Sequence, residues 1–270
     1  MLPVSRADAE AVLRAMGQAG PDAVDLTAAA LACSIHEHPE AGSGQALDVL
    51  EALIAAARTS QPQTVEALAQ LLFARFGFEG DTETYDDPAN ADLRTVLVRR
   101  RGLPVALGVV WRHVARALGL PLAGTNMPGH FVMRMEAPAG PVLVDVFQGG
   151  AILDRPALEQ MARQAGEAGL TPKMIEPVPD VLLAIRLQTN LAARARVAGE
   201  LEAWERAAWR RALLLPSDPG IQLEHAEAAA ACGLLARARD AAGLALATAR
   251  TEAQAEAARR LLSTAGRRLN

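Results

Sequence analysis

Residues 100–121 read Arg-Arg-Gly-Leu-Pro-Val-Ala-Leu-Gly-Val-Val-Trp-Arg-His-Val-Ala-Arg-Ala-Leu-Gly-Leu-Pro. Proline fits the first position of a helix, because the N–H that it lacks would have no partner there. Pro104 therefore predicts a helix start. The segment 105–118 is apolar on most sides, and its titratable residues fall on one narrow stripe. A helix that is apolar nearly all round is buried, so we expect this one at the centre of a domain, ending at Gly119.

The flanking sequence predicts helices before this segment and short strands after it. Residues 6–75 have helical periodicity, and strands are expected at 131–135, 142–147 and 151–153. From residue 180 onward the pattern is helical, in paired segments near the tetratricopeptide period of ~34 residues, with fewer than three units. The predicted organisation has two parts: a domain over 1–176, with a helical part at 1–76 and a core at 77–170, and helical repeats over 180–270.

Composition excludes several classes of protein. The 270 residues are 51% apolar and 21% charged, with a net charge of −4. This balance is globular and lacks the basic footprint of a nucleic-acid-binding protein. No apolar stretch reaches the ~18 residues of a membrane span, and the first residues do not resemble a signal peptide. The two cysteines, Cys33 and Cys232, lack paired or metal-binding spacing. We therefore expect a cytoplasmic protein with no cofactor and no metal, and no nucleic-acid or membrane partner.

The two strands after the central helix suggest a polar pair. A four-residue loop at 136–139 gives a hairpin register in which paired residue numbers sum to 275. His130 would then face Asp145, with Cβ atoms roughly 5 Å apart. A carboxylate that orients a histidine supplies two thirds of a catalytic triad, although a buried, satisfied polar pair has the same spacing. The start of the central helix suits a thiolate nucleophile, but residues 104–107 contain no Cys, Ser or Thr.

Several of these segments together resemble the SirB family, bacterial transglutaminase-like proteins with C-terminal tetratricopeptide-like repeats. The resemblance spans most of residues 20–265. It rests on Arg100 to Leu107, on Arg116 to Pro121, on Pro128-Gly129-His130-Phe131, on Val144 to Phe147 with Gly149-Gly150, and on Tyr85-Asp86-Asp87-Pro88 with Asn90 and Leu93. Asp81 and Asp92 depart from the family pattern, which affects only the details of the acidic loop around Tyr85.

The resemblance implies an α+β fold with a papain/transglutaminase-like core: a central helix on a small antiparallel sheet, a helical N-terminal part and an all-α C-terminal repeat module. Active members of the superfamily place a Cys at a helix start, followed by His and Asp on adjacent strands. Their positions correspond here to Pro104, His130 and Asp145. The residues expected to line a degenerate binding cleft are Tyr85, Arg100, Pro104, Asn126 and Phe131.

Two functions are favoured at this point, and a purely structural role or a metabolic regulator is a further alternative. Without a thiolate, the cleft favours a non-catalytic binding or scaffold protein that engages a protein or peptide partner through the cleft, the repeats or both. Alternatively, His130 and Asp145 act as a general base in a hydrolase or another enzyme with a changed mechanism. The sequence favours a protein without catalytic activity and does not predict the oligomeric state.

Other candidate residues have simpler structural explanations. Cys33 is expected to be a buried thiol, although His36 is near enough on a helix to contact it. The acidic loop at 79–92 is expected to be solvated and to pair with Arg99–Arg101 rather than to hold a cation. His113 is expected on the surface, and nothing distinguishes His225. The three tryptophans, Trp111, Trp204 and Trp209, are expected in the core or at a domain interface.

Overall fold

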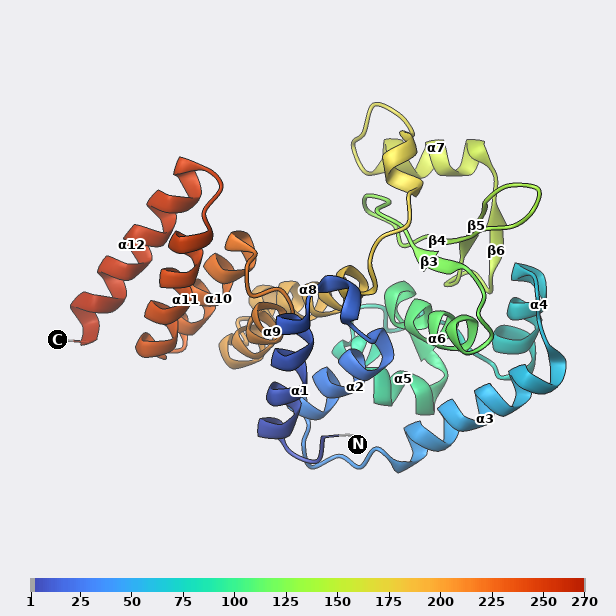
Figure 1. Ribbon diagram of the computed structural model, residues 1–270, viewed down its shortest axis with the longest axis horizontal. Helices are drawn as coiled ribbons and strands as arrows, with labels where there is room; N and C mark the ends of the chain where they lie inside the picture. Colours follow the sequence, from blue (N-terminus) through green and yellow to red (C-terminus); the bar gives the residue numbers. More distant parts are fainter. Residues whose placement is uncertain (1–2, 270) are drawn as a thin grey trace.

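The computed structural model describes the backbone of residues 3–269 and the side chains of residues 3–266 (Figure 1). Helix α6 (Pro104–Ala117) lies at the centre and buries nine of its side chains or glycine positions, among them Trp111, which is 1% exposed. Pro104 occupies the first turn, and Leu103 before it is extended. The predicted central helix and its start are confirmed.

A four-stranded antiparallel sheet follows α6 and has the order β3-β4-β5-β6. Its strands are β3 (Leu122–Gly124), β4 (Met133–Met135), β5 (Val142–Asp145) and β6 (Ala151–Leu153). A short parallel pair, β1 (Glu79–Gly80) and β2 (Arg101–Gly102), precedes the start of α6. The sequence patterns did not predict β3, which follows Pro121 directly after the end of α6.

Helices account for most of the remaining described residues. The N-terminal part contains α1 (Arg6–Ala19), α2 (Leu26–Glu37), α3 (Gly44–Ser60), α4 (Val65–Ala69) and α5 (Leu93–Arg99), and α7 (Arg155–Gln164) follows the sheet. The C-terminal part contains α8 (Asp180–Ala198), α9 (Leu201–Leu214), α10 (Pro219–Ala231), α11 (Leu235–Thr248) and α12 (Glu252–Leu269). Short 3₁₀ turns lie at Pro21–Ala23, Pro88–Ala91 and Pro172–Ile175, and a π-helical turn covers Gln70–Arg75. No helix within residues 3–269 combines the length and apolarity that crossing a bilayer requires.

Successive side chains of the strands alternate between the two faces of the sheet, and each face contributes to a different apolar cluster. Met133 and Val144 belong to the main core, which also contains the buried face of α6. Val132 and Leu143 belong to a smaller cluster with Leu158 of α7. Because successive residues of a strand point to opposite faces, α6 and α7 cover the two faces of one sheet (Figure 1).

The C-terminal helices pack in sequence, each against the next, from α8 to α12 (Figure 1). Helix α8 also contributes Val181, Leu183, Ala184 and Leu187 to the main core. Helix α1 packs against α9, and a Cβ at Gly17 would lie 2.0 Å from the carbonyl oxygen of Leu213. The predicted fold class is confirmed, while the domain boundary near 176–180 stays a prediction.

Candidate functional site

The start of α6 is fixed by bonds on both sides of Pro104. The Leu103 N–H donates to the carbonyl of Asn90 at 2.8 Å, and the Leu103 carbonyl accepts from Leu107. Arg100 ends α5 with a left-handed φ of 64° and leads into β2. Pro104 is half-buried and offers neither a side-chain nucleophile nor a backbone N–H.

The hairpin after α6 differs from the predicted register by two residues. Its paired residues are Met133–Val144, Arg134–Leu143 and Met135–Val142, so their numbers sum to 277. The connection runs over 136–141 and includes a turn in which the Gly140 N–H donates to Ala137, with φ of 116° at Gly140. The prediction of a shorter loop was wrong because Pro141 has no N–H for the ladder. Extending the observed register places Val132, not His130, opposite Asp145.

Asp145 is engaged by the turn that follows it. Its Oδ1 accepts from the backbone N–H groups of Phe147 at 2.9 Å and Gln148 at 3.2 Å. Burial raises the pKa of Asp145, and these two bonds and the nearby His130 oppose that rise. Within the described side chains, no hydrogen bond or ion pair joins Asp145 to His130. The two residues are neighbours, but they are not the bonded pair that the register predicted.

His130 lies in the loop before β4 and is brought to α6 by the next residue. Phe131 is 6% exposed, and a Cβ at Gly108 would lie 2.4 Å from its ring. Gly108 is one turn into the helix from Pro104. Arg186 of α8 donates to the His130 carbonyl and stacks over the Phe131 ring at 5.5 Å. Phe131 is therefore a packing residue that places the His130 loop beside the helix start.

Aromatic residues cover the other side of this site. Tyr85 is 45% exposed and meets Phe147 edge to face, with ring centroids 5.9 Å apart. The Phe147 ring lies over Gly80 of β1, where a Cβ would approach it to 2.5 Å. Burial lowers the pKa of Arg186, and the nearby Tyr85 opposes that shift. We use the name α6-start site for Pro104, His130 and Asp145 with Tyr85 and Phe147.

The other two candidate binding residues lie differently. Arg100 stacks over the rings of Phe76 at 5.6 Å and Phe78 at 5.1 Å, and it donates to the Phe76 carbonyl at 2.8 Å. Its guanidinium is thus committed to local packing. Asn126 is exposed, and its side chain makes no hydrogen bond to the rest of the described chain.

The acidic loop pairs with neighbouring arginines, as predicted. Arg99 reaches Asp81 at 3.0 Å, and Arg101 reaches Glu79 at 2.8 Å. The expectation of a solvated loop was wrong for Asp81, which is buried. Its side chain holds the loop through hydrogen bonds rather than facing solvent. Its carboxylate accepts from the backbone N–H and the hydroxyl of Thr84, and these bonds lower the pKa of Asp81.

The remaining candidates behave as structural residues. Burial raises the pKa of Cys33 to about 12, so this thiol stays protonated, and the pKa of Cys232 is also raised by burial.

His113 is not a surface residue: it is half-buried and lies 3.1 Å from the Thr27 hydroxyl, and burial lowers its pKa. His225 is buried and stacks on Trp209, with centroids 4.8 Å apart. Among the described residues, no group of three His, Cys, Asp or Glu side chains could hold a metal ion.

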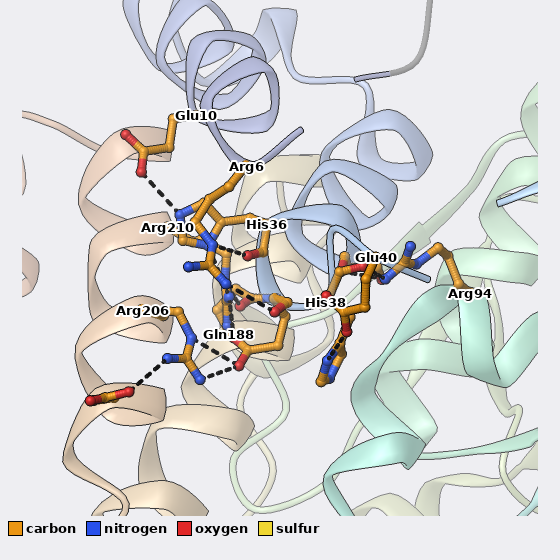
Figure 2. A network of polar contacts seen from close by, with 12 residues as sticks. Arg6, Glu10, His36, His38, Glu40, Arg94, Gln188, Arg206 and Arg210 are labelled. Carbon is orange, nitrogen blue, oxygen red and sulfur yellow. Dashed lines mark hydrogen bonds and ion pairs between the residues drawn. The ribbon is translucent and has the colours of Figure 1, made fainter. Parts of the chain in front are cut away.

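A buried ion-pair network joins the N-terminal and C-terminal helices (Figure 2). Glu37 at the end of α2 accepts two bonds from Arg206, at 2.6 and 3.0 Å, and one from Arg210. Arg210, 1% exposed, also donates to Gln188 of α8 at 2.6 Å and contacts His36. Burial and Arg210 lower the pKa of His36. No sequence signal predicted this α2–α9 network, whose members lie up to 174 positions apart.

Comparison with known families now bears on this geometry. A family model described as the Transglutaminase-like superfamily matches residues 44–189, which include α6, the sheet and most of α8. The chain belongs to the transglutaminase-like superfamily. The matched range contains Pro104, His130 and Asp145, so the α6-start site lies within the superfamily domain.

Relatives of this superfamily member come from bacteria and animals. A UPF0162 protein of Xylella fastidiosa (strain Temecula1) is 34% identical over 166 residues, which cover 58% of this chain and 58% of that protein. A UPF0162 protein of Vibrio cholerae is 32% identical over 135 residues, covering 47% of this chain and 50% of that one. The human F-box only protein 21 is 32% identical over 87 residues, 32% of this chain and 14% of that protein. The chain thus spans under two thirds of these relatives, and no solved structure matches it.

Proposed function

We propose that this superfamily member is a non-catalytic binding protein that holds a protein or peptide partner at the α6-start site. The observation that carries the proposal is Pro104 at the first turn of α6, where the resemblance to the SirB family aligns the superfamily's cysteine. A proline provides no thiolate, and it removes one N–H donor that could stabilise an oxyanion. Tyr85 of this site is 45% exposed and offers a contact to a partner, and Asn126, in the connection between β3 and His130, is also exposed.

The two cysteines of the chain do not replace the missing nucleophile. Cys33 and Cys232 lie on or beside other helices, and the pKa of each thiol is raised. A hydrolase that uses His130 as a general base has less support, because a base is oriented by a hydrogen bond to its carboxylate partner. Here Asp145 accepts from two backbone N–H groups of its own turn instead.

We further propose that the chain is a cytoplasmic SirB-type protein whose helices α8–α12 form a tetratricopeptide-like module. Consecutive antiparallel packing of these helices supports that assignment. In this proposal the module adds a second protein-binding surface to the α6-start site.

Photo-cross-linking at Asn126 tests the binding function. We expect a partner to be cross-linked from native cytoplasm by the full chain and lost in His130→Ala. The control variant Glu51→Ala, which changes an exposed residue of α3, should retain it. Equal recovery by both variants, or substrate turnover by the wild type that depends on His130, would overturn the proposal.

Installing the missing thiol tests the position of the site. Pro104→Cys places a cysteine at a helix N-terminus, where the dipole and free N–H groups lower a thiol pKa. We expect it to react with iodoacetamide at neutral pH at least ten times faster than Cys232, which serves as the internal control. A folded variant whose new thiol is as slow as Cys232 would show that the site has been misplaced.

A further inference from the structure

A cavity of about 960 Å³ lies where the N-terminal helices meet the C-terminal stack. It borders the α6-start site at Tyr85, whose ring is stacked against Arg194 of the cavity wall. It lies between the end of α2, the 86–92 segment, α8 and the first half of α9, and neither Pro104, His130 nor Asp145 lines it. Its volume is near the upper end of the ~300–1,000 Å³ typical of ligand pockets. We name this cavity the α8 groove, and we infer that it binds an extended peptide segment of a partner protein that combines apolar residues with a basic side chain.

The shape and lining of the α8 groove fit an extended peptide. Lining residues follow α8 from Gln188 to Ala198, a rise of ~15 Å at 1.5 Å per residue, which matches four to five extended residues. The apolar part of the wall comes from Pro88, Leu191, Val197 and several alanines of the 86–92 segment, α8 and α9. Val197 is 91% exposed, and Leu201 beyond it is 43% exposed, so apolar surface continues past the cavity.

Polar groups in the groove offer hydrogen bonds that a peptide backbone can accept. Arg194 lines the wall, and its Nε is buried with no acceptor within the described residues. Its guanidinium pairs with Asp86 at 3.2 Å, lies 3.4 Å from the Tyr85 carbonyl and stacks over the Tyr85 ring at 5.6 Å. Gln188 on the floor is 1% exposed and uses Oε1 to accept from Arg210, which leaves its amide nitrogen as a donor. The Gln188 amide nitrogen is therefore the donor that a peptide carbonyl can use.

The charge around the groove favours a basic side chain in the ligand. Its lining contains five carboxylates, on Glu37, Asp86, Asp87, Asp92 and Glu200, against three guanidiniums. All three guanidiniums are already paired, Arg206 and Arg210 with Glu37 and Arg194 with Asp86. Asp86 is 89% exposed, and Glu200 is exposed without an ion pair in the described part of the chain. The lining therefore has two more carboxylates than guanidiniums, and its exposed charge at Glu200, unpaired among the described residues, is negative.

The α8 groove does not include Pro104, His130 or Asp145, and its peptide test is distinct from the cross-linking and thiol tests of the α6-start site, so each proposal can fail alone. The test uses the full chain and an array of octapeptides with an apolar third residue and a basic sixth residue, beside matched peptides with an acidic sixth residue. We expect binding in the basic series and at least tenfold weaker binding in the acidic series, with affinity falling as salt is raised. No binding in the basic series, or equal binding of both series, would overturn the inference.

Variants of the groove locate the binding. Ala198→Trp fills the groove, and Asp86→Lys reverses one charge of the rim. We expect at least a tenfold and a threefold loss of affinity, respectively. The matched controls are Ala236→Trp and Glu227→Lys, exposed positions on α11 and α10, and Pro104→Cys should also bind normally. Unchanged binding by Ala198→Trp would overturn the assignment to this groove.

Discussion

The α2–α9 network gives the sharpest quantitative test of how the two halves of the chain are joined. Its centre is Glu37, whose side chain is 18% exposed and which accepts bonds from Arg206 and Arg210. Replacing Glu37 with Gln preserves the size of the side chain and removes its charge. Arg210, 1% exposed, would then be a buried cation without a counter-ion.

Two independent estimates give the size of the effect. The two arginines outweigh burial and lower the pKa of Glu37 from 4.5 to about 2. At ~1.4 kcal/mol per pKa unit, this shift favours the ionised form by about 3 kcal/mol in the folded state. Removing one partner of a buried ion pair typically costs ~3–5 kcal/mol. We therefore expect Glu37→Gln to lower the free energy of unfolding by about 3 kcal/mol at pH 7.

The pH dependence of this effect has a defined sign. The folded pKa of Glu37, about 2, is below its unfolded value of 4.5. Its stabilisation is therefore complete above pH 4.5 and is lost as the pH falls towards 2. Since Gln does not titrate, the difference in unfolding free energy between wild type and Glu37→Gln should shrink across that window.

Urea unfolding followed by circular dichroism and tryptophan fluorescence measures the difference. Glu40→Gln is the matched control, because Glu40 is 73% exposed and its ion pair with His38 is 3.5 Å long. The control should stay within ~0.5 kcal/mol of the wild type. Adding Arg210→Met to Glu37→Gln should recover part of the loss, since no buried cation then lacks a partner. A Glu37→Gln effect no larger than that of the control would refute the reasoning.

Two glycines give further predictions. Gly17→Ala should destabilise the protein by more than ~2 kcal/mol, because the new Cβ would lie 2.0 Å from the Leu213 carbonyl oxygen. Gly243→Ala is the control: a Cβ there would have no atom within 4 Å, so this variant should be neutral or stabilising by up to ~1 kcal/mol. Gly150→Ala should lower the melting temperature, because Gly150 has φ of 86° and its Cβ would lie 2.8 Å from the Trp111 ring. Thermal unfolding checks both, and equal midpoints for Gly17→Ala and Gly243→Ala would contradict the α1–α9 packing.

The central element of the fold could be predicted from local sequence. Pro104 sets a helix start through its fixed φ and missing N–H, and the apolar run behind it requires burial. Strand β6, Ala151–Leu153, begins and ends at the predicted residues. The sequence also predicted that His130 and Asp145 lie near each other. The hairpin register behind that prediction was wrong by two residues. Here the length of the 136–141 connection, rather than the strands, set the pairing.

Other features were decided only by tertiary structure. Arg100, singled out as a binding residue, packs on Phe76 and Phe78 because these rings come to lie beside the end of α5. The α2–α9 network and the α8 groove join segments more than 150 positions apart. Propensity and periodicity describe interactions within a turn or a strand pair. They therefore predicted the helices, and the family resemblance followed from short motifs that are also local in sequence. Contacts between distant helices depend on how those elements pack, and no local spacing encodes them.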